Sequence, residues 1–597
     1  MKNRNINYIL VIVSAIIMML TFGSCEKYLD KAPEADIKAN EVYGNFRSYQ
    51  GFIEELYNCV CDYNKCRAWN EYLFADETLN NNPYPFDQGN YWAQTRMLYG
   101  PFTSSSTGSD PRNKTIWPLA WYGIRKANVA LSNLDLLVDA TQEEKDIIKG
   151  QALFFRGWFH FELMRWWGGL PYMDKALTAE DDFNVPRLSY RETALKAAQD
   201  FRDAADLLPL NWDSTTVGKV TLGNNRGRIN KLYALGYLGK DLLYAASPMM
   251  NEESTGTNAF DAELCKQAAE AFAEVLKICD ETHRYTLQPW SSWTDNFWVW
   301  SPGNKTINGG TEVIMLPTVF RYDRVRWSTV MGTCPAEFGN ATVEVPTNNF
   351  VKNYAMANGL PIDDPASGFN PNDPWTGREP RFYSDIVKDG DRLIIGTGGA
   401  ADRYALLYNG GRHRSSTKGS VTGFYYKRYS PIGCNQYDNK WAYFQSYIPY
   451  MRLADVYLMY SESVLQGYGS GSNSVPGYSL TAVQAINIVR NRAQLPDLTS
   501  AYTATKEAFM GEIIRERAVE LAFEGARFHD LRRWNIAGEK KYTEKTAIDF
   551  DRGTDGKPKN LVERVVITRV FEKKHNWLPF QVSFTNLYPE FTQNPGW

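Results

Sequence analysis

Apolar residues recur at helical spacing along much of the chain. Between Gln142 and Trp167 they stand three and four positions apart, with acidic residues in the first turn and a Gly-Gly pair just after Trp167. This is the pattern of a helix with a glycine end. The same spacing predicts further helices over 117–137, 191–208, 229–246, 262–279, 450–466, 482–492 and 506–534. They come in pairs joined by Gly or Pro breaks without a fixed repeat length, so the pattern predicts a mainly helical protein built from helix pairs.

Residues 281–448 lack this periodicity. Gly, Pro, Asn, Asp and Trp dominate the stretch, and only short runs such as 312–316 and 423–429 have the character of strands. A long non-periodic stretch inside an ordered protein is usually functional. We therefore expect an irregular, loop-rich region there, built onto the helical scaffold.

The first apolar run has a different origin. Two basic residues precede the almost wholly apolar stretch 9–20, and the small pair Gly23 and Ser24 leads to Cys25. These are the features of a secretory signal, and the run is short for a membrane span. A cysteine directly after small residues is typical of a bacterial lipoprotein signal, in which the thiol takes the lipid; the alternative is an ordinary signal with an incidental cysteine. Multiple acyl chains anchor firmly, so we expect a mature chain that starts at Cys25 and is tethered by lipid.

Composition argues against several functions. The net charge is −3 over 597 residues, and no basic block interrupts the chain. Nucleic acid and anionic membrane surfaces are therefore poor candidates for partners. Cys59, Cys61 and Cys66 lie close together, but no CxxC pair or nearby histidine accompanies them. Packed or free thiols are thus favoured over a zinc site. No spaced ligand set for calcium is found either, and we predict no metal and no cofactor.

Several motifs resemble the SusD/RagB family. They are RGWFHFELMRWWGGLPY at 156–172, YMRLADVYLMYSES at 450–463, INIVRNRAQLPDL at 486–498 and IIRERAVELAFEGARFHDLRRW at 513–534. NDPWTGREPRFYSDIVKDG at 372–390 is similar to a further family segment, with Glu379-Pro380-Arg381 where the family usually has Asp-Pro-Arg. Both ends of the expected mature chain are also similar to family termini, so the resemblance covers it throughout.

The resemblance implies both a fold and a function. The fold is mainly α, with tetratricopeptide-like helix pairs packed against an irregular, loop-rich ligand-binding region that has a few short strands. The function is that of a non-catalytic lipoprotein, anchored in the outer membrane and facing the cell surface. Such a protein captures oligo- or polysaccharide and delivers it to a SusC-type TonB-dependent transporter. The implied partners are this glycan, this transporter and, through the N-terminal lipid only, the membrane.

These inferences together divide the chain into four parts. We expect a lipoprotein signal peptide at 1–24 and an N-terminal helical part at 25–280 that carries a ligand-loop insertion near 75–116. The irregular region follows at 281–448, and a C-terminal helical part with a tail occupies 449–597.

Two alternative functions stay open. One is a lipoprotein of the same fold that binds peptides or other non-sugar nutrients, and the other is a secreted glycan-cleaving enzyme. The enzyme would need two carboxylates that flank the scissile bond. Glu520 and Glu524 lie one helical turn apart, among arginines at three- and four-residue spacings such as Arg517 and Arg527. That spacing favours a structural ion network. We interpret His529 as a packed or capping residue and predict no catalytic residue.

Candidate glycan contacts are aromatic residues that stand beside polar ones in the non-periodic segments. A ring can cover the C–H face of a sugar, while amide, carboxylate and guanidinium groups bond its hydroxyls. The stretches 75–94 and 289–300 combine both kinds of residue. The candidates are Asp76, Asn80, Asn82, Tyr84, Tyr91, Trp92, Trp290, Trp293, Asp295, Asn296, Trp298 and Trp300. Trp92 and Trp293 are the strongest single candidates, although core packing is the commoner role for any one of these rings.

Overall fold

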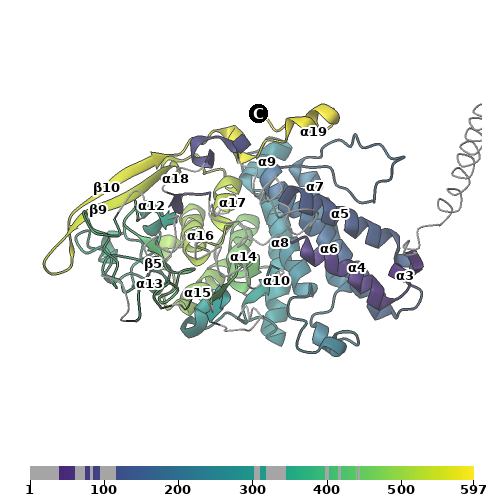
Figure 1. Ribbon diagram of the computed structural model, residues 1–597, viewed down its shortest axis with the longest axis horizontal. Coiled ribbons are helices and arrows are strands. Elements are labelled where there is room, and N and C mark those ends of the chain that lie inside the picture. Colours follow the sequence, from purple (N-terminus) through teal and green to yellow (C-terminus); the bar gives the residue numbers. More distant parts are fainter. Residues whose placement is uncertain are drawn as a thin grey trace, which may run out of the picture.

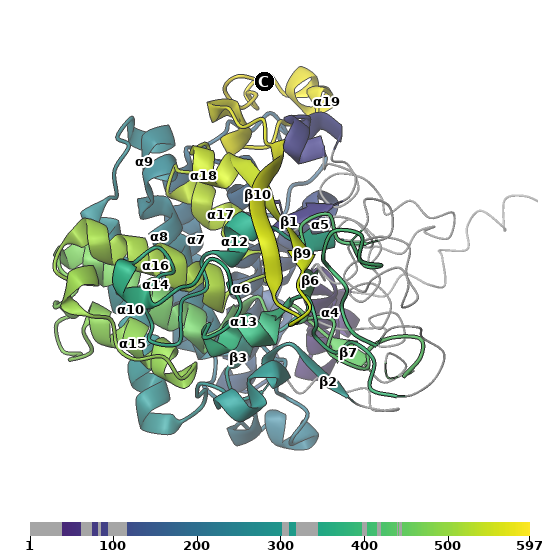
Figure 2. The same ribbon diagram turned by 90° about the vertical axis from the view of Figure 1, so that its left-hand side faces the viewer.

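The computed structural model describes residues 39–60, 74–80, 85–93, 116–300, 310–317, 344–396, 403–414, 419–438, 440 and 444–597. The expected signal peptide, Cys25, the neighbouring Cys61 and Cys66, and the candidates Asn82 and Tyr84 lie outside these residues. Figure 1 shows the N-terminal helices on one side and a long hairpin with irregular segments on the other, and Figure 2 looks onto that second side.

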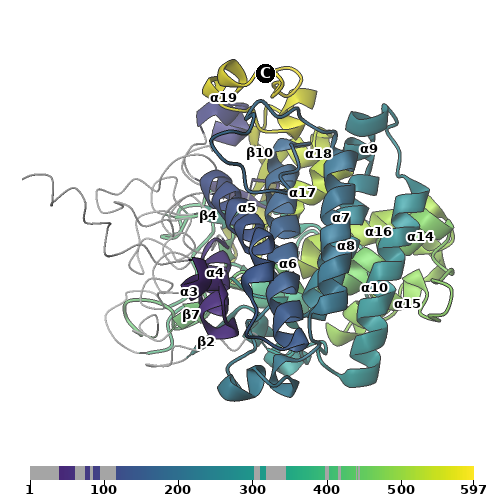
Figure 3. The same cartoon turned by 90° about the vertical axis from the view of Figure 1, so that its right-hand side faces the viewer.

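A continuous layer of helices forms the scaffold, in which successive helices pack on one another (Figure 3). The N-terminal members are α3 (Ala39–Tyr43), α4 (Phe46–Asn58), α5 (Ile116–Ser132), α6 (Gln142–Trp167), α7 (Tyr190–Leu207), α8 (Lys231–Ala246), α9 (Pro248–Thr255) and α10 (Ala262–Thr282). α10 then packs on α14 (Leu453–Tyr468), which also contacts α15 (Ala482–Arg492) and α16 (Lys506–Glu520). Since α10 and α14 are neighbours in space, the irregular region between them is an insertion that leaves the helical layer unbroken. The expected mainly helical, paired architecture is confirmed.

α6 shows how local signals set a helix. The Thr141 hydroxyl accepts the Glu144 N–H, and the Glu144 carboxylate accepts the Thr141 N–H, which closes a capping box. Gly168 ends the helix with a φ of 81°, a value that favours glycine. The predicted range of 142–167 is confirmed to the residue. Between its ends the helix buries large rings, and its last turn adds the fully buried indoles of Trp166 and Trp167 to the core.

The single helix predicted over 506–534 is wrong. The chain forms α16 and then α17 (Ala526–Arg533), with a break in which Phe523 has a φ of 62° and Gly525 one of 80°. The carbonyl groups of Glu520 and Ala522, which a continuous helix would use internally, accept hydrogen bonds from two buried arginines instead. Tertiary hydrogen bonds therefore replace helical ones at this point.

Five antiparallel strand pairs occur among the described residues. Four are short. β1 (Thr78–Asn80) with β4 (Glu344–Pro346) ties the insertion to the N-terminal part, and β3 (Val313–Met315) with β8 (Met451–Arg452) ties it to the start of α14. β2 (Trp298–Trp300) with β7 (Phe444–Ser446), and β5 (Ile386–Val387) with β6 (Tyr425–Tyr426), join segments within the insertion. The short helices α12 (Asn348–Val351) and α13 (Pro380–Asp385) lie in the same insertion.

The fifth pair is a long hairpin that the sequence analysis missed. β9 (Glu544–Arg552) and β10 (Pro558–Thr568) follow α18 (Lys540–Thr543) and precede α19 (Val582–Leu587), where helices and a tail were expected. β9 is mostly buried and packs on α12, whereas β10 is mostly exposed. The turn sequence GTDGKP, followed by a run rich in β-branched residues, is the signal that points to it. Among the described helices, none combines the length and the apolar composition that a membrane crossing requires.

Candidate functional site

The two predicted glycan-binding stretches occupy different ends of the described structure. The short helices η2 (Pro85–Gln88) and η3 (Tyr91–Ala93) lie next to the C-terminal segment and α19, whereas β2 and β7 lie at the opposite end (Figures 2 and 3). The described residues of the two stretches therefore do not combine into one site.

In the first stretch, Trp92 is the described candidate whose side chain is exposed. Its indole is 45% exposed and meets the ring of Trp597 edge-on, with 5.8 Å between the ring centroids. Tyr91 is buried and stacks on Phe86. Asp76 is also buried, and its two carboxylate oxygens accept hydrogen bonds of 2.9 and 3.1 Å from Arg527. The expectation that Asp76 and Tyr91 face a sugar is thus not supported, because core contacts occupy both. Asn80 belongs to β1 by its backbone, and its side chain is not described.

In the second stretch, burial separates the indoles of η8 (Trp290–Asn296). Trp293 is only 1% exposed, since Trp290 stacks on it with 5.0 Å between centroids and the guanidinium of Arg428 lies 4.7 Å from its ring. Asn296 is buried as well and donates to Glu312. Trp293 and Asn296 are therefore core residues in this structure, contrary to the expectation for the strongest candidate. Trp290 covers Trp293 and is only partly buried.

The remaining candidates of this stretch are partly exposed. Trp298 and Trp300 stand on the same face of β2, with their rings edge to face at 5.3 Å, and β7 pairs with that strand. The ammonium of Lys440 lies 5.6 Å from the Trp300 ring. Asp295 is half-buried, and burial raises the pKa of its carboxyl group. These residues thus border the surface.

A buried ion network lies beneath η8. Glu520 accepts hydrogen bonds from Arg381 at 3.0 Å, from Arg452 at 2.7 Å and from Arg492. Burial alone would raise the pKa of Glu520, but the guanidinium groups of Arg492, Arg452 and Arg381 outweigh it and lower the pKa far below its ordinary value. The Glu520 carboxylate is fully buried and bonded to three arginines, so it cannot contact a glycosidic bond. The predicted structural role of Glu520 is supported by this geometry.

The partners in the network differ from those suggested by helical spacing. Glu524 bonds Arg428 and Arg452, which come from the insertion and from β8. Arg517 pairs with Asp455 and Asp530, and Arg527 pairs with Asp76. These charges of α16, α17 and the break between them thus connect the two helices to each other, to α14, to the insertion and to the segment that carries Asp76.

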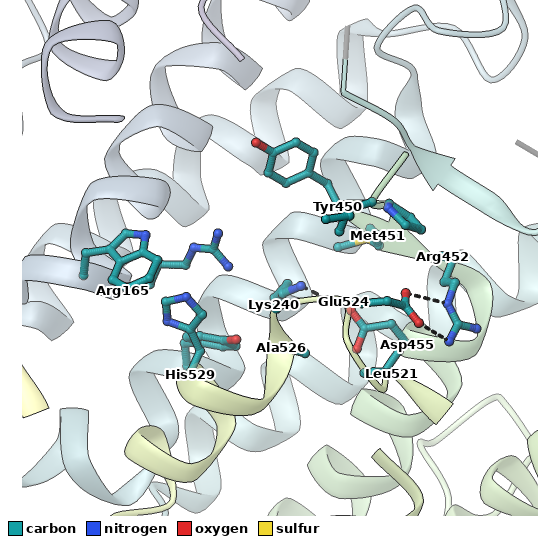
Figure 4. Close-up of a pocket in the computed structure, with 15 residues that line it drawn as sticks. Arg165, Lys240, Tyr450, Met451, Arg452, Asp455, Leu521, Glu524, Ala526 and His529 are labelled. Carbon is teal, nitrogen blue, oxygen red and sulfur yellow. Dashed lines mark hydrogen bonds and ion pairs between the residues drawn. The ribbon is translucent and has the colours of Figure 1, made fainter. Parts of the chain in front are cut away.

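A small polar cavity lies between α6, α8, α14 and the break before α17 (Figure 4). The figure shows Lys240 beside Asp455 on one side and Arg165 with His529 on another. Its volume is about 40 Å³, whereas a water needs about 10–15 Å³ and ligand pockets have about 300–1,000 Å³. It has room for water and not for a sugar. His529 is buried, and burial together with nearby cations lowers its pKa well below the ordinary value, so the ring is a neutral packed residue as predicted.

A larger pocket opens at the surface between η8, α13 and the segment after α15. Its volume is about 470 Å³, which lies within the range of ligand sites. The residues that line it are Trp290, Ala357, Arg378, Pro380, Tyr383, Ser384 and Gln494. It thus combines two aromatic side chains with hydroxyl, amide and guanidinium groups. We refer to it below as the Trp290 pocket.

The walls of the Trp290 pocket are held by contacts behind them. The Tyr383 hydroxyl donates to the Trp375 carbonyl at 2.6 Å and accepts the Arg378 N–H at 3.2 Å. On the opposite wall, Trp290 rests on Trp293. Both walls are therefore formed before any ligand arrives.

Sequence reasoning missed most of this pocket. Only Trp290 was a candidate; the others, except Ala357, belong to segments that were recognised as family motifs and given no binding role. The criterion of rings beside polar groups also applies to WTGREPRFYS at 375–384, and it was the available signal. In the part of the chain that the structure describes, no group of His, Cys, Asp or Glu is arranged to hold a metal ion. Cys59, Cys265, Cys279 and Cys434 are buried.

Comparison with known families matches two family models. Residues 311–597 match the SusD family, and residues 27–233 match a family described as starch-binding and associating with the outer membrane. A search of curated proteins found no match.

Solved structures of similar fold extend over nearly the whole chain. A SusD-like protein from Bacteroides fragilis is 21% identical, with 95% of this chain and 100% of that chain covered and a TM-score of 0.67. A SusD-like carbohydrate binding protein from the same species is 18% identical, with 92% and 99% covered and a TM-score of 0.64. A SusD homolog from Bacteroides thetaiotaomicron is 16% identical, with 94% and 99% covered and a TM-score of 0.60. At these identities the likeness establishes the fold.

Proposed function

Because this chain belongs to the SusD/RagB family, we propose that it is a non-catalytic glycan-binding lipoprotein of the outer membrane. In this proposal it is anchored through Cys25, faces the cell surface, and delivers captured oligo- or polysaccharide to a SusC-type TonB-dependent transporter. The starch-binding description of one matching family and the carbohydrate-binding name of one structural relative support the choice of ligand class. The carboxylates of Glu520 and Glu524 are occupied by hydrogen bonds from buried arginines, which supports a role in structure rather than in catalysis.

The observation that carries the proposal is the Trp290 pocket. Its volume suits a few sugar rings, its two aromatic walls suit their C–H faces, and Ser384 and Gln494 supply hydroxyl and amide groups for their rims. Trp298 and Trp300 lie on β2, which contacts η8, and extend an aromatic surface from it. We propose that the glycan lies across Trp290 and Tyr383.

Trp92 remains a proposed contact at a second position. It is the more exposed indole, but the neighbouring Tyr91 is buried and Trp597 is partly buried. Paired substitutions therefore distinguish the two positions.

The test uses the soluble chain that starts at Glu26. Binding to an array of polysaccharides identifies a ligand, calorimetry gives its Kd, and an end-product assay on the same sample detects cleavage. A stacked ring contributes about 0.5–1.5 kcal/mol, so Trp290→Ala should raise Kd about 2- to 13-fold, while Trp92→Ala leaves Kd unchanged. The reverse pattern would place the site at Trp92. Released product would contradict the non-catalytic proposal, and failure to bind any glycan would favour the peptide-binding alternative.

A further inference from the structure

The Trp290 pocket is lined by a buried cation that makes no ion pair with a carboxylate of the described residues. Arg378 is 4% exposed, and its guanidinium donates only to main-chain carbonyl groups. These belong to Val351, Tyr354, Ala355 and Pro374. A guanidinium has five N–H donors. The four hydrogen bonds use the N–H of Nε, one N–H of Nη1 and both N–H groups of Nη2. The second N–H of Nη1 therefore has no partner among the described residues. A guanidinium with a spare donor therefore borders an open pocket.

The neighbouring Arg381 differs from Arg378, because carboxylates surround its guanidinium. Arg381 bonds the carboxylates of Glu379, Glu516 and Glu520. In Arg378, by contrast, burial outweighs the nearby carboxylate of Glu379 and lowers the pKa to about 10, as expected for a desolvated charge that makes no direct ion pair. Arg532 is also bonded only to carbonyls, but it lies in the core and lines neither of the cavities described above.

A second cation, Lys427, contacts the main chain of the aromatic wall. The ammonium of Lys427 donates to the main-chain carbonyl of Tyr383, and the side chain is half-buried. In the described part of the chain, no carboxylate lies within ion-pair distance of it. The residues that line the pocket include no acid. Tyr383 thus bonds the main-chain N–H of Arg378 and the ammonium of Lys427. Glu379 acts on Arg378, and Asp391 and Asp385 act on Lys427, without direct contact. Among the described residues, neither cation therefore makes an ion pair with a carboxylate.

We infer that the Trp290 pocket prefers acidic sugars, whose carboxylate or sulfate group supplies the missing counter-ion. This inference rests on the proposed glycan-binding function. Guanidinium groups recognise carboxylate and sulfate oxygens through short, charge-assisted hydrogen bonds. The sugar ring lies against Trp290, and its anionic group faces the spare Nη1 donor of Arg378. A neutral sugar fits the same walls but leaves that charge unpaired.

The experiment compares each acidic oligosaccharide with its own neutral form. One arm uses oligogalacturonate and its carboxyl-reduced counterpart; the other uses a sulfated oligosaccharide and its desulfated counterpart. Calorimetry on the soluble chain measures Kd at 50 and 300 mM salt. We expect at least tenfold tighter binding of the acidic form in one arm, with a preference that shrinks as salt rises. The arm in which this occurs identifies the anionic group.

Variants assign the preference to the pocket. Arg378→Gln should weaken binding of the acidic form much more than binding of the neutral form, so that the acidic preference disappears. Arg47→Gln, at an exposed position on α4, makes the same change in net charge and should alter nothing. If Arg378→Gln does not fold, Lys427→Gln provides the second measurement and should reduce the preference at least threefold.

The outcomes separate the two levels of inference. Equal binding of acidic and neutral forms, lost in Trp290→Ala, overturns the acidic preference and leaves the proposed function intact. An acidic preference that survives both Arg378→Gln and Lys427→Gln also overturns it, because the anion is then recognised elsewhere. Absence of binding to any glycan removes the proposed function itself.

Discussion

Replacing Glu312 with glutamine should destabilise the protein and loosen the Trp290 pocket at the same time. Glu312 is fully buried just before β3. One of its oxygens accepts the main-chain N–H of Gln288 at 3.0 Å and the side-chain amide of Asn296 at 2.9 Å. Gln288 and Asn296 bracket η8, so a single carboxylate group holds both ends of the segment that carries Trp290.

The magnitude follows from the two cations that Glu312 also holds. Its Oε1 accepts from Arg452 at 2.6 Å, and its Oε2 accepts from Arg492 at 2.7 Å. In the wild-type protein each carboxylate oxygen accepts hydrogen bonds. In either orientation of a glutamine amide, its N–H₂ group would face donor groups that bond a carboxylate oxygen in the wild-type protein. Removing one partner of a buried ion pair costs about 3–5 kcal/mol. Since a folded protein is stable by about 5–15 kcal/mol, the loss is a large part of the total.

The effect should also depend on pH. Burial alone would raise the pKa of Glu312, but Arg492 and Arg452 outweigh it, so the pKa lies below the ordinary value of 4.5. A carboxyl group with a lowered folded-state pKa stabilises the protein above its unfolded pKa, and this contribution disappears as pH falls through the folded-state value. The difference in unfolding free energy between the wild-type chain and Glu312→Gln should therefore be full at pH 7 and shrink on acidification.

Urea unfolding followed by tryptophan fluorescence measures this difference. Glu281→Gln is the matched control, because Glu281 is an exposed glutamate on α10. Calorimetry with the identified glycan, in buffer without urea, should show weaker binding to Glu312→Gln than to the control. If Glu312→Gln is as stable as Glu281→Gln at pH 7, the ion network does not support η8 and the reasoning fails.

Three further changes test other parts of the structure. Asp241→Asn should stabilise the chain at neutral pH, because neither carboxyl oxygen of this fully buried residue has a hydrogen-bond partner among the described residues and burial raises its pKa well above the ordinary range. The gain in urea unfolding should grow by about 1.4 kcal/mol per pH unit above the unfolded pKa of about 3.9 until the folded group ionises, and vanish below it; a gain independent of pH contradicts this. Gly169→Ala should lower the free energy of unfolding, measured in a thermal scan, by about 1–3 kcal/mol, since its Cβ would lie 2.1 Å from the Leu188 carbonyl oxygen. The control Gly227→Ala should leave stability unchanged in the same scan, because its Cβ would meet nothing within 4 Å. The Cys25→Ala protein should be lost from the outer-membrane fraction of detergent-free lysates, because the thiol is the proposed lipid carrier. Retention of the variant in that fraction would refute the lipid anchor.

How much of the fold follows from the sequence depends on where the deciding contacts lie. The bounds of α6 were predictable, because the Thr141–Glu144 capping box and Gly168 are local signals. The break between α16 and α17 was not, because Arg428 and Arg452 create it from distant segments. The β9–β10 hairpin lay between these cases: its turn is visible in the sequence, but β10 lacks a clean alternation of apolar and polar residues.

The same distinction explains the candidate site. Trp290 and Trp293 are three residues apart in one short, non-periodic run, and nothing in that run separates a binding residue from a core residue. Arg428 decides between them, because its guanidinium lies against Trp293 and draws that ring into the core, which leaves Trp290 as the outer layer. Arg428 in turn is held by Asp385 at the end of α13, the helix that forms the opposite wall of the pocket. The Arg428–Asp385 ion pair thus positions both walls of the pocket. Trp290 is available for binding because Arg428, more than one hundred positions away in the sequence, packs against Trp293 in the core.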